Sequence, residues 1–323
     1  MQKVDILVPG SLPETTITTL AETFACHRAG GHGEVDAIVA RDGGKLRGMA
    51  RGGHFGVDRD LIDRLPKLEI IANFGVGYDG IDLVRCAERG IVVTNTPDVL
   101  TEEVADTALG LLLNTVRELS AAERYLRAGR WERDGNYPLT KATMRDRTVG
   151  IAGLGRIGLA IARRLDAMGV PVVYYTRTEK PGIRYRYFSD LKVMAEAVDT
   201  MIAVLPGTPA TQRIINADIF RALGREGIFI NIGRGATVDD AALIEALRTG
   251  AIRAAGLDVF TDEPHVPAAL MALDNVVLLP HVGSGSVFTR NAMGQLMIDN
   301  LTSWFGAGKP LTPVPETPWP PKG

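Results

Sequence analysis

Cysteine is scarce in this chain, since only Cys26 and Cys86 occur among its 323 residues. Two cysteines are too few for a disulfide framework and lack the spacing of a metal site, as is typical of proteins from a reducing compartment. No segment approaches the roughly 18 consecutive apolar residues of a membrane span, and the N-terminus lacks the regions of a secretion signal. We therefore expect a cytoplasmic protein with no membrane partner.

A strong charge of one sign is also missing. The formal net charge is −2 and the sequence pI is about 6.2, which gives no general attraction to nucleic acid. With 46% hydrophobic and 23% charged residues, the composition is that of a globular protein long enough for two domains. A small molecule is therefore the expected partner.

Short β-branched runs alternate with helix-like segments, a pattern that predicts α/β domains with parallel sheets. The first series of expected strands is VDILVPG, DAIVA, LRGMAR, LEIIANFG and IVVTN. The second series is TVGIAGLG, PVVYYT, DTMIAVLP, GIFINIG, AAGLDVF and NVVLLPH. Two such series predict two sheets and hence two domains.

Three further segments have expected structures. Residues 101–129 predict one long helix, with Thr101 as its cap. The amphipathic stretch FTRNAMGQLMIDNLTSWF follows the last strand and is expected to return to the first domain. The proline-rich residues 311–323 favour a poorly ordered or surface-clinging tail over a binding motif. His27 and His32 are expected in a surface loop.

A glycine-rich loop lies between an expected strand and an expected helix. The sequence GLGRIG places Gly153, Gly155 and Gly158 where a dinucleotide site needs a tight turn, close backbone approach to a pyrophosphate and close helix packing. A purely structural glycine turn is the alternative. We expect the whole loop to contact the dinucleotide, including Leu154, Arg156 and Ile157.

The next strand indicates which dinucleotide binds. NAD sites carry an acid at the tip of this strand, about 20 residues after the glycines, for the ribose 2′-hydroxyl. Here the strand runs into Thr176, Arg177 and Thr178, with Lys180 close behind. These side chains suit a 2′-phosphate and predict NADP(H). In the alternative, the basic residues are merely solvated and Glu179 accepts from the ribose.

Three ionisable residues follow three expected strands of the second sheet. Arg234, Glu263 and His281 come after GIFINIG, GLDVF and NVVLLP, and ligands bind at this edge of parallel sheets. This set suits the reduction of a keto acid. The arginine would bind the substrate carboxylate or carbonyl, one residue would donate a proton, and the carboxylate would keep that donor protonated. Each residue alone has a structural alternative, and His265 could replace His281 only if it pointed inward. No metal-ligand set is apparent.

The ordered motifs resemble the D-isomer-specific 2-hydroxyacid dehydrogenase family over nearly the whole chain. They are FGVGYDGID, TPDVLTEEVAD, VGIAGLGRIG, NIGRGATVDDAALIEAL, GLDVFTDEP and LLPHVGSGS. The resemblance gives Arg234, Glu263 and His281 the catalytic roles. It gives the substrate carboxylate to the backbone N–H groups of Val76 and Gly77, and the pocket to Leu100 and Ser284. The further expected cofactor contacts are Leu205, Pro206, Thr211, Asp258 and Gly283.

The resemblance also implies a domain organisation. Residues 1–99 and 286–323 would form a discontinuous, flavodoxin-like substrate domain, and residues 100–285 a Rossmann domain, with the active site in a cleft between them. The family usually forms homodimers, here through residues 101–145. Trp131 and Tyr137 are candidate anchors of that contact, with packing inside one chain as the alternative.

Within the family, YYTRTEK and GRWERDGNYPLT resemble the NADPH-dependent glyoxylate/hydroxypyruvate reductase and hydroxyphenylpyruvate reductase branch. This implies reduction of a small 2-keto acid to the D-2-hydroxy acid. Hydroxyphenylpyruvate, 2-ketogluconate, phosphoglycerate, formate and phosphite stay open as substrates, and Arg51 could supply a cation for a phosphorylated one. A non-catalytic dinucleotide sensor or corepressor is the alternative outside enzymes.

Overall fold

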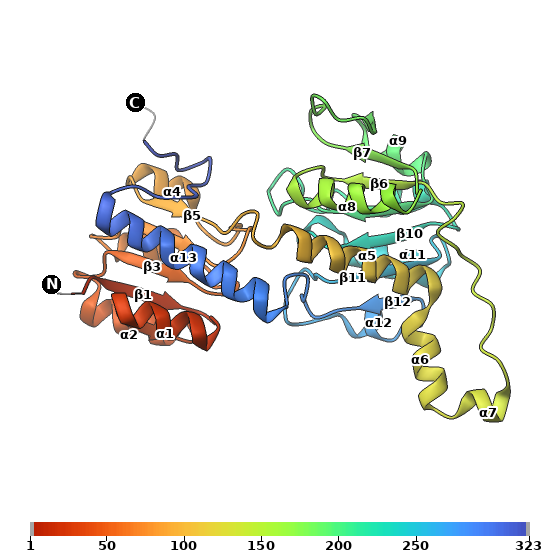
Figure 1. Cartoon of the computed structure of the whole chain (residues 1–323), viewed down its shortest axis with the longest axis horizontal. Helices are drawn as coiled ribbons and strands as arrows, with labels where there is room; N and C mark the ends of the chain where they lie inside the picture. Colours follow the sequence, from red (N-terminus) through yellow and green to blue (C-terminus); the bar gives the residue numbers. More distant parts are fainter. Residues whose placement is uncertain (1–2, 321–323) are drawn as a thin grey trace. The chain divides into compact units, whose positions relative to one another are not determined.

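The computed structural model describes residues 3–320, which divide into two compact units. Unit 1 comprises the residues up to Leu100 and those from Ser286 onward, and unit 2 comprises Thr101–Gly285. Each unit is built on one parallel sheet flanked by helices (Figure 1), so both are of the α/β class. Among residues 3–320, no helix is long and apolar enough to cross a membrane.

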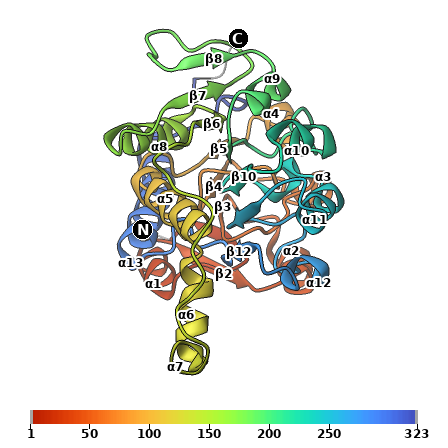
Figure 2. The same ribbon diagram turned by 90° about the vertical axis from the view of Figure 1, so that its right-hand side faces the viewer.

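Unit 1 holds a five-stranded sheet in the order β2-β1-β3-β4-β5, which is the flavodoxin-like order. Its strands are β1 (Asp5–Pro9), β2 (Ala25–Ala29), β3 (Gly48–Arg51), β4 (Ile70–Asn73) and β5 (Val92–Thr94). Its helices are α1 (Glu14–Thr23), α2 (His32–Asp42), α3 (Arg59–Asp63), α4 (Leu83–Glu88) and α13 (Val287–Ala307). Helices α1 and α13 cover one face, and α2, α3 and α4 cover the other (Figures 1 and 2).

The core of unit 1 explains why its strands read as continuous apolar runs. Leu7, Met49, Ile71 and Val93, one from each of four strands, are fully buried in one cluster. Strands covered by helices on both faces cannot alternate apolar and polar residues. The expected return of the last amphipathic segment is confirmed, because α13 packs on α1 and on β4.

Unit 2 holds a seven-stranded sheet in the order β12-β11-β10-β9-β6-β7-β8, a Rossmann arrangement with one added strand. Its strands are β6 (Val149–Ala152), β7 (Val172–Tyr175), β8 (Arg186–Phe188), β9 (Thr200–Ala203), β10 (Ile228–Asn231), β11 (Ala254–Leu257) and β12 (Val276–Leu278). The edge strand β8 was not expected, since RYF is short and lies beside charged residues.

The helices of unit 2 cover both faces of this sheet. Helices α5 and α8 pack together on one face, and α10 and α11 lie on the other (Figure 2). The helices are α5 (Thr101–Arg117), α6 (Leu119–Arg127), α7 (Arg130–Asp134), α8 (Arg156–Ala167), α9 (Leu191–Glu196), α10 (Ala217–Leu223), α11 (Asp240–Arg248) and α12 (Ala268–Met271), with a 3-10 turn, η1, at Gly235–Thr237.

The long helix expected over residues 101–129 is in fact two helices. Glu118 adopts a left-handed backbone with φ 55°, which separates α5 from α6, and α6 and α7 project from the body of unit 2 (Figures 1 and 2). Asn114 holds this corner, since its side chain accepts from the Ser120 N–H and donates to the Ser120 hydroxyl. Thr101 is the first residue of α5 rather than its cap.

Two expectations for the N-terminal region are wrong. The stretch DAIVA lies in helix α2 rather than in a strand, because Val35, Ile38 and Val39 are buried at helical spacing. His27 lies in β2 rather than in a surface loop, and its Nε2 contacts Asp5 Oδ1 at 2.7 Å. The sequence ACHRA lacks the β-branched residues that mark strands, so the pattern missed it.

The proline-rich tail is fixed to unit 1 over its described residues, while residues 321–323 lie outside them. Val314 is 1% exposed and its N–H donates to Val93 O. The Thr317 hydroxyl accepts from the Val93 N–H, so the tail extends the hydrogen bonding of β5. Burial raises the pKa of Tyr78 to about 12, and its hydroxyl donates to Glu316. Of the two expected forms, the tail therefore has the surface-clinging one.

Candidate active site

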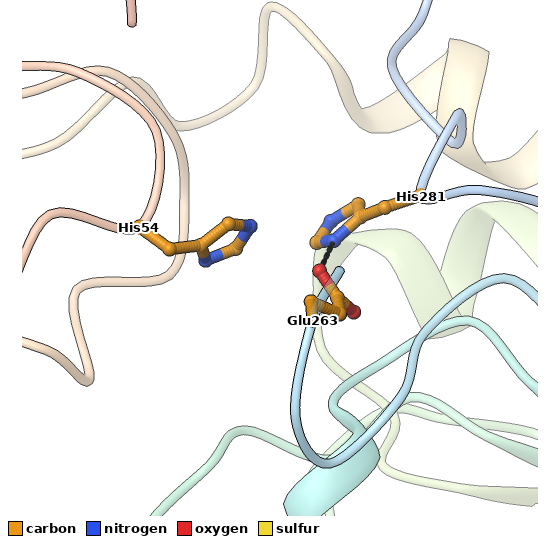
Figure 3. Close-up of side chains that lie close together, drawn as sticks. All are labelled: His54, Glu263 and His281. Carbon is orange, nitrogen blue, oxygen red and sulfur yellow. Dashed lines mark hydrogen bonds and ion pairs between the residues drawn. The ribbon is translucent and has the colours of Figure 1, made fainter. Parts of the chain in front are cut away.

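His281 and Glu263 form a close pair in unit 2. Nδ1 of His281 lies 2.6 Å from Oε2 of Glu263, and the two side chains are 30% and 17% exposed (Figure 3, which also draws His54 of unit 1). The other carboxylate oxygen accepts from the Phe260 N–H at 2.9 Å. A carboxylate at Nδ1 fixes the tautomer and leaves Nε2 to exchange a proton. This is the arrangement of a histidine acid or base with its orienting carboxylate.

Asp258, which follows β11, holds the backbone around His281. Its two carboxylate oxygens accept from the N–H groups of Val282 at 2.7 Å and Gly283 at 2.8 Å, and its carbonyl accepts from the His281 N–H. Its side chain is buried, and this burial raises the pKa of Asp258 despite the two N–H donors. The left-handed backbone of His281, at φ 52°, is thus tied to the end of β11.

Arg234 follows β10 and begins the turn η1. Its carbonyl accepts from Asn231 Nδ2 and from the Thr237 hydroxyl, which fixes the backbone, and its Nη1 donates to Gly233 O. A Cβ on Gly235 would lie 1.9 Å from the Phe260 backbone, so the turn presses against the segment leading to Glu263. The backbone of Arg234 is therefore firmly held, and it lies at the same edge of the sheet as the His281–Glu263 pair.

The three glycines of the 153–158 loop have separate physical roles. Gly153 has φ +102°, and a Cβ on Gly158 would lie 2.2 Å from Gly153 O, so both positions need glycine for the fold itself. A Cβ on Gly155 would meet nothing within 4 Å. Gly155 is the N-cap of α8, without a side-chain cap or an acid in the first turn. The open space at a helix N-terminus fits a pyrophosphate.

The loop after β7 displays its basic residues. Arg177 and Lys180 are exposed, and neither side chain has an ion pair or hydrogen bond within residues 3–320. The Thr176 hydroxyl donates to Thr178 O at 2.7 Å, which turns the chain. Two cations at this strand tip, where an NAD site would hold an acid, fit a 2′-phosphate. Glu179, between the two basic residues, is exposed as well.

The other expected cofactor residues lie at the same edge of the sheet. Leu205 and Pro206 follow β9, and the Thr211 hydroxyl donates to Pro206 O at 2.6 Å, closing that loop. Gly283 packs on Asp258, where a Cβ would lie 3.0 Å from Oδ2. The loops after β6, β7, β9 and β11 therefore surround the switch between β6 and β9, where Rossmann sheets bind dinucleotides.

The loop after β4 in unit 1 presents backbone N–H groups. Asn73 Nδ2 donates to Gly75 O and Gly77 O at 3.0 Å, and Asn95 Nδ2 donates to Val76 O at 2.9 Å. In a trans peptide the C=O and the next N–H point in opposite directions. The N–H groups of Val76 and Gly77 therefore point away from the asparagines, without an acceptor in the described part of the chain. Such a nest suits an anion.

Several residues have other roles than expected. Arg51 is 3% exposed and donates to Phe55 O and Asn73 Oδ1, so it is not a spare cation for a phosphorylated substrate. His265 is exposed and does not compete with His281. His32 begins α2 rather than lying in a loop. The expected pocket residues Leu100 and Ser284 stay predictions: Leu100, 5% exposed, ends unit 1, and Ser284 follows Gly283 in unit 2.

Comparison with known protein families identifies the family to which unit 2 is similar. The family described as D-isomer specific 2-hydroxyacid dehydrogenase, NAD binding domain, matches residues 109–283. The chain belongs to the D-isomer specific 2-hydroxyacid dehydrogenase family. Most of unit 2 therefore corresponds to the NAD binding domain of this dehydrogenase family.

Similar proteins match this dehydrogenase along its length. It is 44% identical over 314 residues to glyoxylate/hydroxypyruvate reductase A of Arabidopsis thaliana, covering 97% of this chain and 100% of the relative. It is 47% identical to hydroxyphenylpyruvate reductase of Plectranthus scutellarioides, covering 86% and 88%. An NADPH-dependent glyoxylate/hydroxypyruvate reductase from Sinorhizobium meliloti, solved with NADP and malonate, is 55% identical with a TM-score of 0.94, covering 98% of both chains.

Sequence reasoning missed the residues that hold the unit 1 loop. Asn73 is the last residue of β4, and Asn95 follows β5. The argument that singled out Arg234, Glu263 and His281, polar residues at the carboxyl ends of parallel strands, applies equally to the first sheet. It would have identified both asparagines of this dehydrogenase.

Proposed function

We propose that this enzyme reduces a small 2-keto acid of the glyoxylate/hydroxypyruvate class to the D-2-hydroxy acid, using NADPH. The observation that carries the proposal is the contact of 2.6 Å between His281 Nδ1 and Glu263 Oε2, which provides an oriented proton donor. The names of the relatives from Arabidopsis thaliana and Sinorhizobium meliloti support the substrate class.

The proposed chemistry assigns each residue one task. When bound, the nicotinamide supplies the hydride to C2 of the keto acid. His281 Nε2 gives its proton to the carbonyl oxygen, which becomes the hydroxyl, and in the reverse direction His281 takes that proton back. Glu263, whose Oε2 lies 2.6 Å from Nδ1, orients the imidazole ring and leaves Nε2 for this exchange. Arg234 holds the carbonyl and carboxylate and stabilises the negative charge that develops on oxygen.

The preference for NADPH is assigned to the loop after β7. We propose that Arg177 stacks on the adenine and pairs with the 2′-phosphate, helped by Lys180 and by the hydroxyls of Thr176 and Thr178. The exposure of both cations supports this assignment. The pyrophosphate would lie over Gly155, where the backbone is open. Leu205, Pro206, Thr211, Asp258 and Gly283 would complete the cofactor site.

The substrate carboxylate is assigned to unit 1. We propose that the N–H groups of Val76 and Gly77 bind it, which their unpartnered orientation supports. Leu100 and Ser284 are proposed to line the pocket around the rest of a small substrate. In this proposal the unit of residues 1–99 and 286–323 is the substrate domain, and residues 100–285 form the cofactor domain.

Steady-state kinetics with both cofactors tests the proposal. Initial rates with NADPH and with NADH are compared for glyoxylate, hydroxypyruvate, hydroxyphenylpyruvate and 2-ketogluconate. We expect kcat/KM to be highest for NADPH with one of the two smallest keto acids. Arg177→Ala combined with Lys180→Ala should raise the KM for NADPH and leave that for NADH nearly unchanged, because charge-assisted hydrogen bonds to the 2′-phosphate are lost.

Variants of two histidines test the catalytic role. His281→Asn should lower kcat about 10² to 10⁴-fold, the usual contribution of a positioned proton donor, with NADPH binding retained. The exposed His265 provides the matched control His265→Asn, which should leave kcat unchanged. Near-full turnover by His281→Asn would reject the mechanism. Tight nucleotide binding by the wild type without reduction of any keto acid would favour a dinucleotide sensor.

We further propose a homodimer formed through the arm of residues 101–145. In its support, Leu119, Leu126, Trp131 and Leu139 are 52%, 55%, 57% and 95% exposed, and large apolar patches mark interfaces. Tyr137 packs edge-on against Tyr125 of its own chain, so Trp131 is the better anchor. Trp131→Glu should produce monomers in light scattering, and an unchanged mass would contradict this interface.

We also propose that the enzyme works in the cytoplasm or another reducing compartment. Both Cys26 and Cys86 are free thiols, as expected where disulfides do not persist. Cell fractionation with an antibody against the protein tests the location. Recovery from an oxidising compartment would contradict it.

A further inference from the structure

Arg51 is a buried cation at the carboxyl end of β3 in unit 1. Its Nε donates to Phe55 O at 2.5 Å, and its Nη1 donates to Asn73 Oδ1. A Cβ on Gly80 would lie 2.6 Å from Nη2, so the turn at Gly80 closes over the guanidinium. One planar head group therefore joins the loop after β3, the end of β4 and the turn before α4. Lysine, with a single nitrogen, lacks this fork.

The guanidinium determines how the Asn73 amide is oriented. Arginine has only donors, so the side chain of Asn73, 1% exposed, must turn its oxygen toward Arg51. Its Nδ2 then faces the carbonyls of Gly75 and Gly77 and donates to both. The opposite orientation would place an amide oxygen against two carbonyl oxygens and an NH2 group against a cation. Arg51 thereby selects the orientation in which the Asn73 amide donates to both loop carbonyls.

Holding the Gly75 carbonyl aims the N–H group of Val76 on the other side of the loop. The Gly75 carbonyl and the Val76 N–H belong to one peptide, so fixing the first directs the second. A hydrogen bond to a carboxylate depends strongly on N–H direction. A buried arginine that contacts no substrate can therefore control how well a carboxylate binds.

We propose that Arg51 is a positioning residue for the substrate carboxylate, acting through Asn73 on the N–H group of Val76. The inference rests on the proposed function in assigning that N–H group to a keto-acid carboxylate. It predicts that Arg51 affects the affinity for the acid and not the cofactor site, which belongs to unit 2.

The first test measures which kinetic constants change: the KM for the keto acid, the kcat or the KM for NADPH. In Arg51→Lys, which keeps the charge but not the fork, the KM for the keto acid should rise about tenfold or more, since hydrogen bonds to a charged group weaken. The kcat at saturating substrate and the KM for NADPH should change less than about twofold. Arg47→Lys is the matched control, because Arg47 precedes the same strand and pairs with Glu69 near the surface. It should leave all constants unchanged.

A double-mutant cycle tests whether the effect passes through Asn73. Asn73→Ser removes the amide donors while Arg51 stays, and it should also raise the KM for the keto acid. The double variant should be no worse than the poorer single variant, because the two changes break one chain of contacts. Additive effects would show that Arg51 acts by another route and would overturn the inference. If Arg51→Lys does not fold, Asn73→Ser alone must show the selective rise in KM.

Malonate binding separates this inference from the proposed function. Titration of the full chain with malonate, without turnover, should shift the amide NMR signals of Val76 and Gly77, and Arg51→Lys should weaken this binding. If no keto acid is reduced but these shifts and their loss occur, the function is wrong and the inference stands. Absence of the shifts in the wild type, or equal malonate affinity in Arg51→Lys, would overturn the inference whatever the activity.

Discussion

The two units present backbone N–H groups to ligands in different ways. In unit 2, the glycine loop is shaped by backbone packing, since Gly158 presses on Gly153 and α8 begins at Gly155 without a side-chain cap. In unit 1, the loop after β4 is shaped by side chains, because amides of Asn73 and Asn95 hold its carbonyls. One site depends on the absence of side chains and the other on their presence.

This difference indicates which substitutions each loop tolerates. A loop formed by backbone contact fails when any Cβ is added at the contact. A loop held by side chains fails when a donor is removed, even where the backbone has room. The following predictions test this contrast, beginning with the largest expected effect.

The largest effect is expected in the glycine loop, where two neighbouring glycines should respond differently to alanine. Gly158→Ala places a methyl 2.2 Å from Gly153 O, which should cost about 1–3 kcal/mol of unfolding free energy or more. Gly155→Ala meets no atom within 4 Å, so its Tm should match the wild type while NADPH affinity falls more than about tenfold. Thermal unfolding without nucleotide and NADPH titration measure the two effects. Wild-type affinity in Gly155→Ala would place the pyrophosphate elsewhere.

A smaller effect is expected for Asp258→Asn. An amide offers one oxygen to the two N–H groups of Val282 and Gly283, so one donor loses its partner at about 1–3 kcal/mol. The backbone around His281 should become less well fixed, so both the kcat and the free energy of unfolding should fall. Urea unfolding and steady-state rates of the variant measure both. Unchanged stability would show that the loop does not depend on this carboxylate.

The difference in unfolding free energy between the wild type and Asp258→Asn should change with pH in one direction. Because the pKa of Asp258 is raised in the folded chain, the folded state binds this proton more tightly than the unfolded state. The wild type therefore loses stability relative to Asp258→Asn as pH rises through the raised pKa. Urea unfolding across mildly acidic pH tests this. A difference between the two proteins that grows with pH would contradict it.

The same contrast explains what the sequence could reveal. The glycine loop and the residues Arg234, Glu263 and His281 follow strands of regular pattern, and their positions relative to those strands are fixed by the fold. The hold of Arg51 on Asn73 joins residues 22 positions apart, and no local spacing encodes it. The glycine motif and the strand-end positions of the two asparagines can be read from the sequence, whereas the long-range side-chain contact that orients Asn73 cannot.

The errors in the fold have equally specific causes. The stretch DAIVA is apolar enough for a strand, and only its burial at helical spacing shows that it belongs to α2. The edge strands β2 and β8 carry His27 and Arg186, polar residues that edge positions tolerate. The turn at Glu118 depends on a left-handed residue other than glycine, for which the sequence gives little warning.

A modest effect is expected at the basic loop after β7, which two tyrosine side chains hold. The Tyr187 hydroxyl donates to Thr176 O at 3.1 Å, and the Lys180 N–H donates to the Tyr174 hydroxyl at 3.0 Å. Tyr187→Phe should weaken NADPH binding about fivefold, the worth of one hydrogen bond of about 1 kcal/mol. NADH binding should not change. Equal losses for both cofactors would indicate a general role in folding unit 2.

The smallest effect is expected at Thr96, whose backbone helps to hold the loop after β4 but whose side chain does not. Its N–H donates to Gly75 O, but its buried hydroxyl has no hydrogen-bond partner among residues 3–320. Thr96→Val keeps the N–H and removes an unsatisfied group, so stability should be unchanged or rise by up to about 1 kcal/mol. The KM for the keto acid should be unchanged, in contrast to Asn73→Ser. A rise in KM would mean that this hydroxyl takes part in the loop, and would extend the set of side chains on which unit 1 depends.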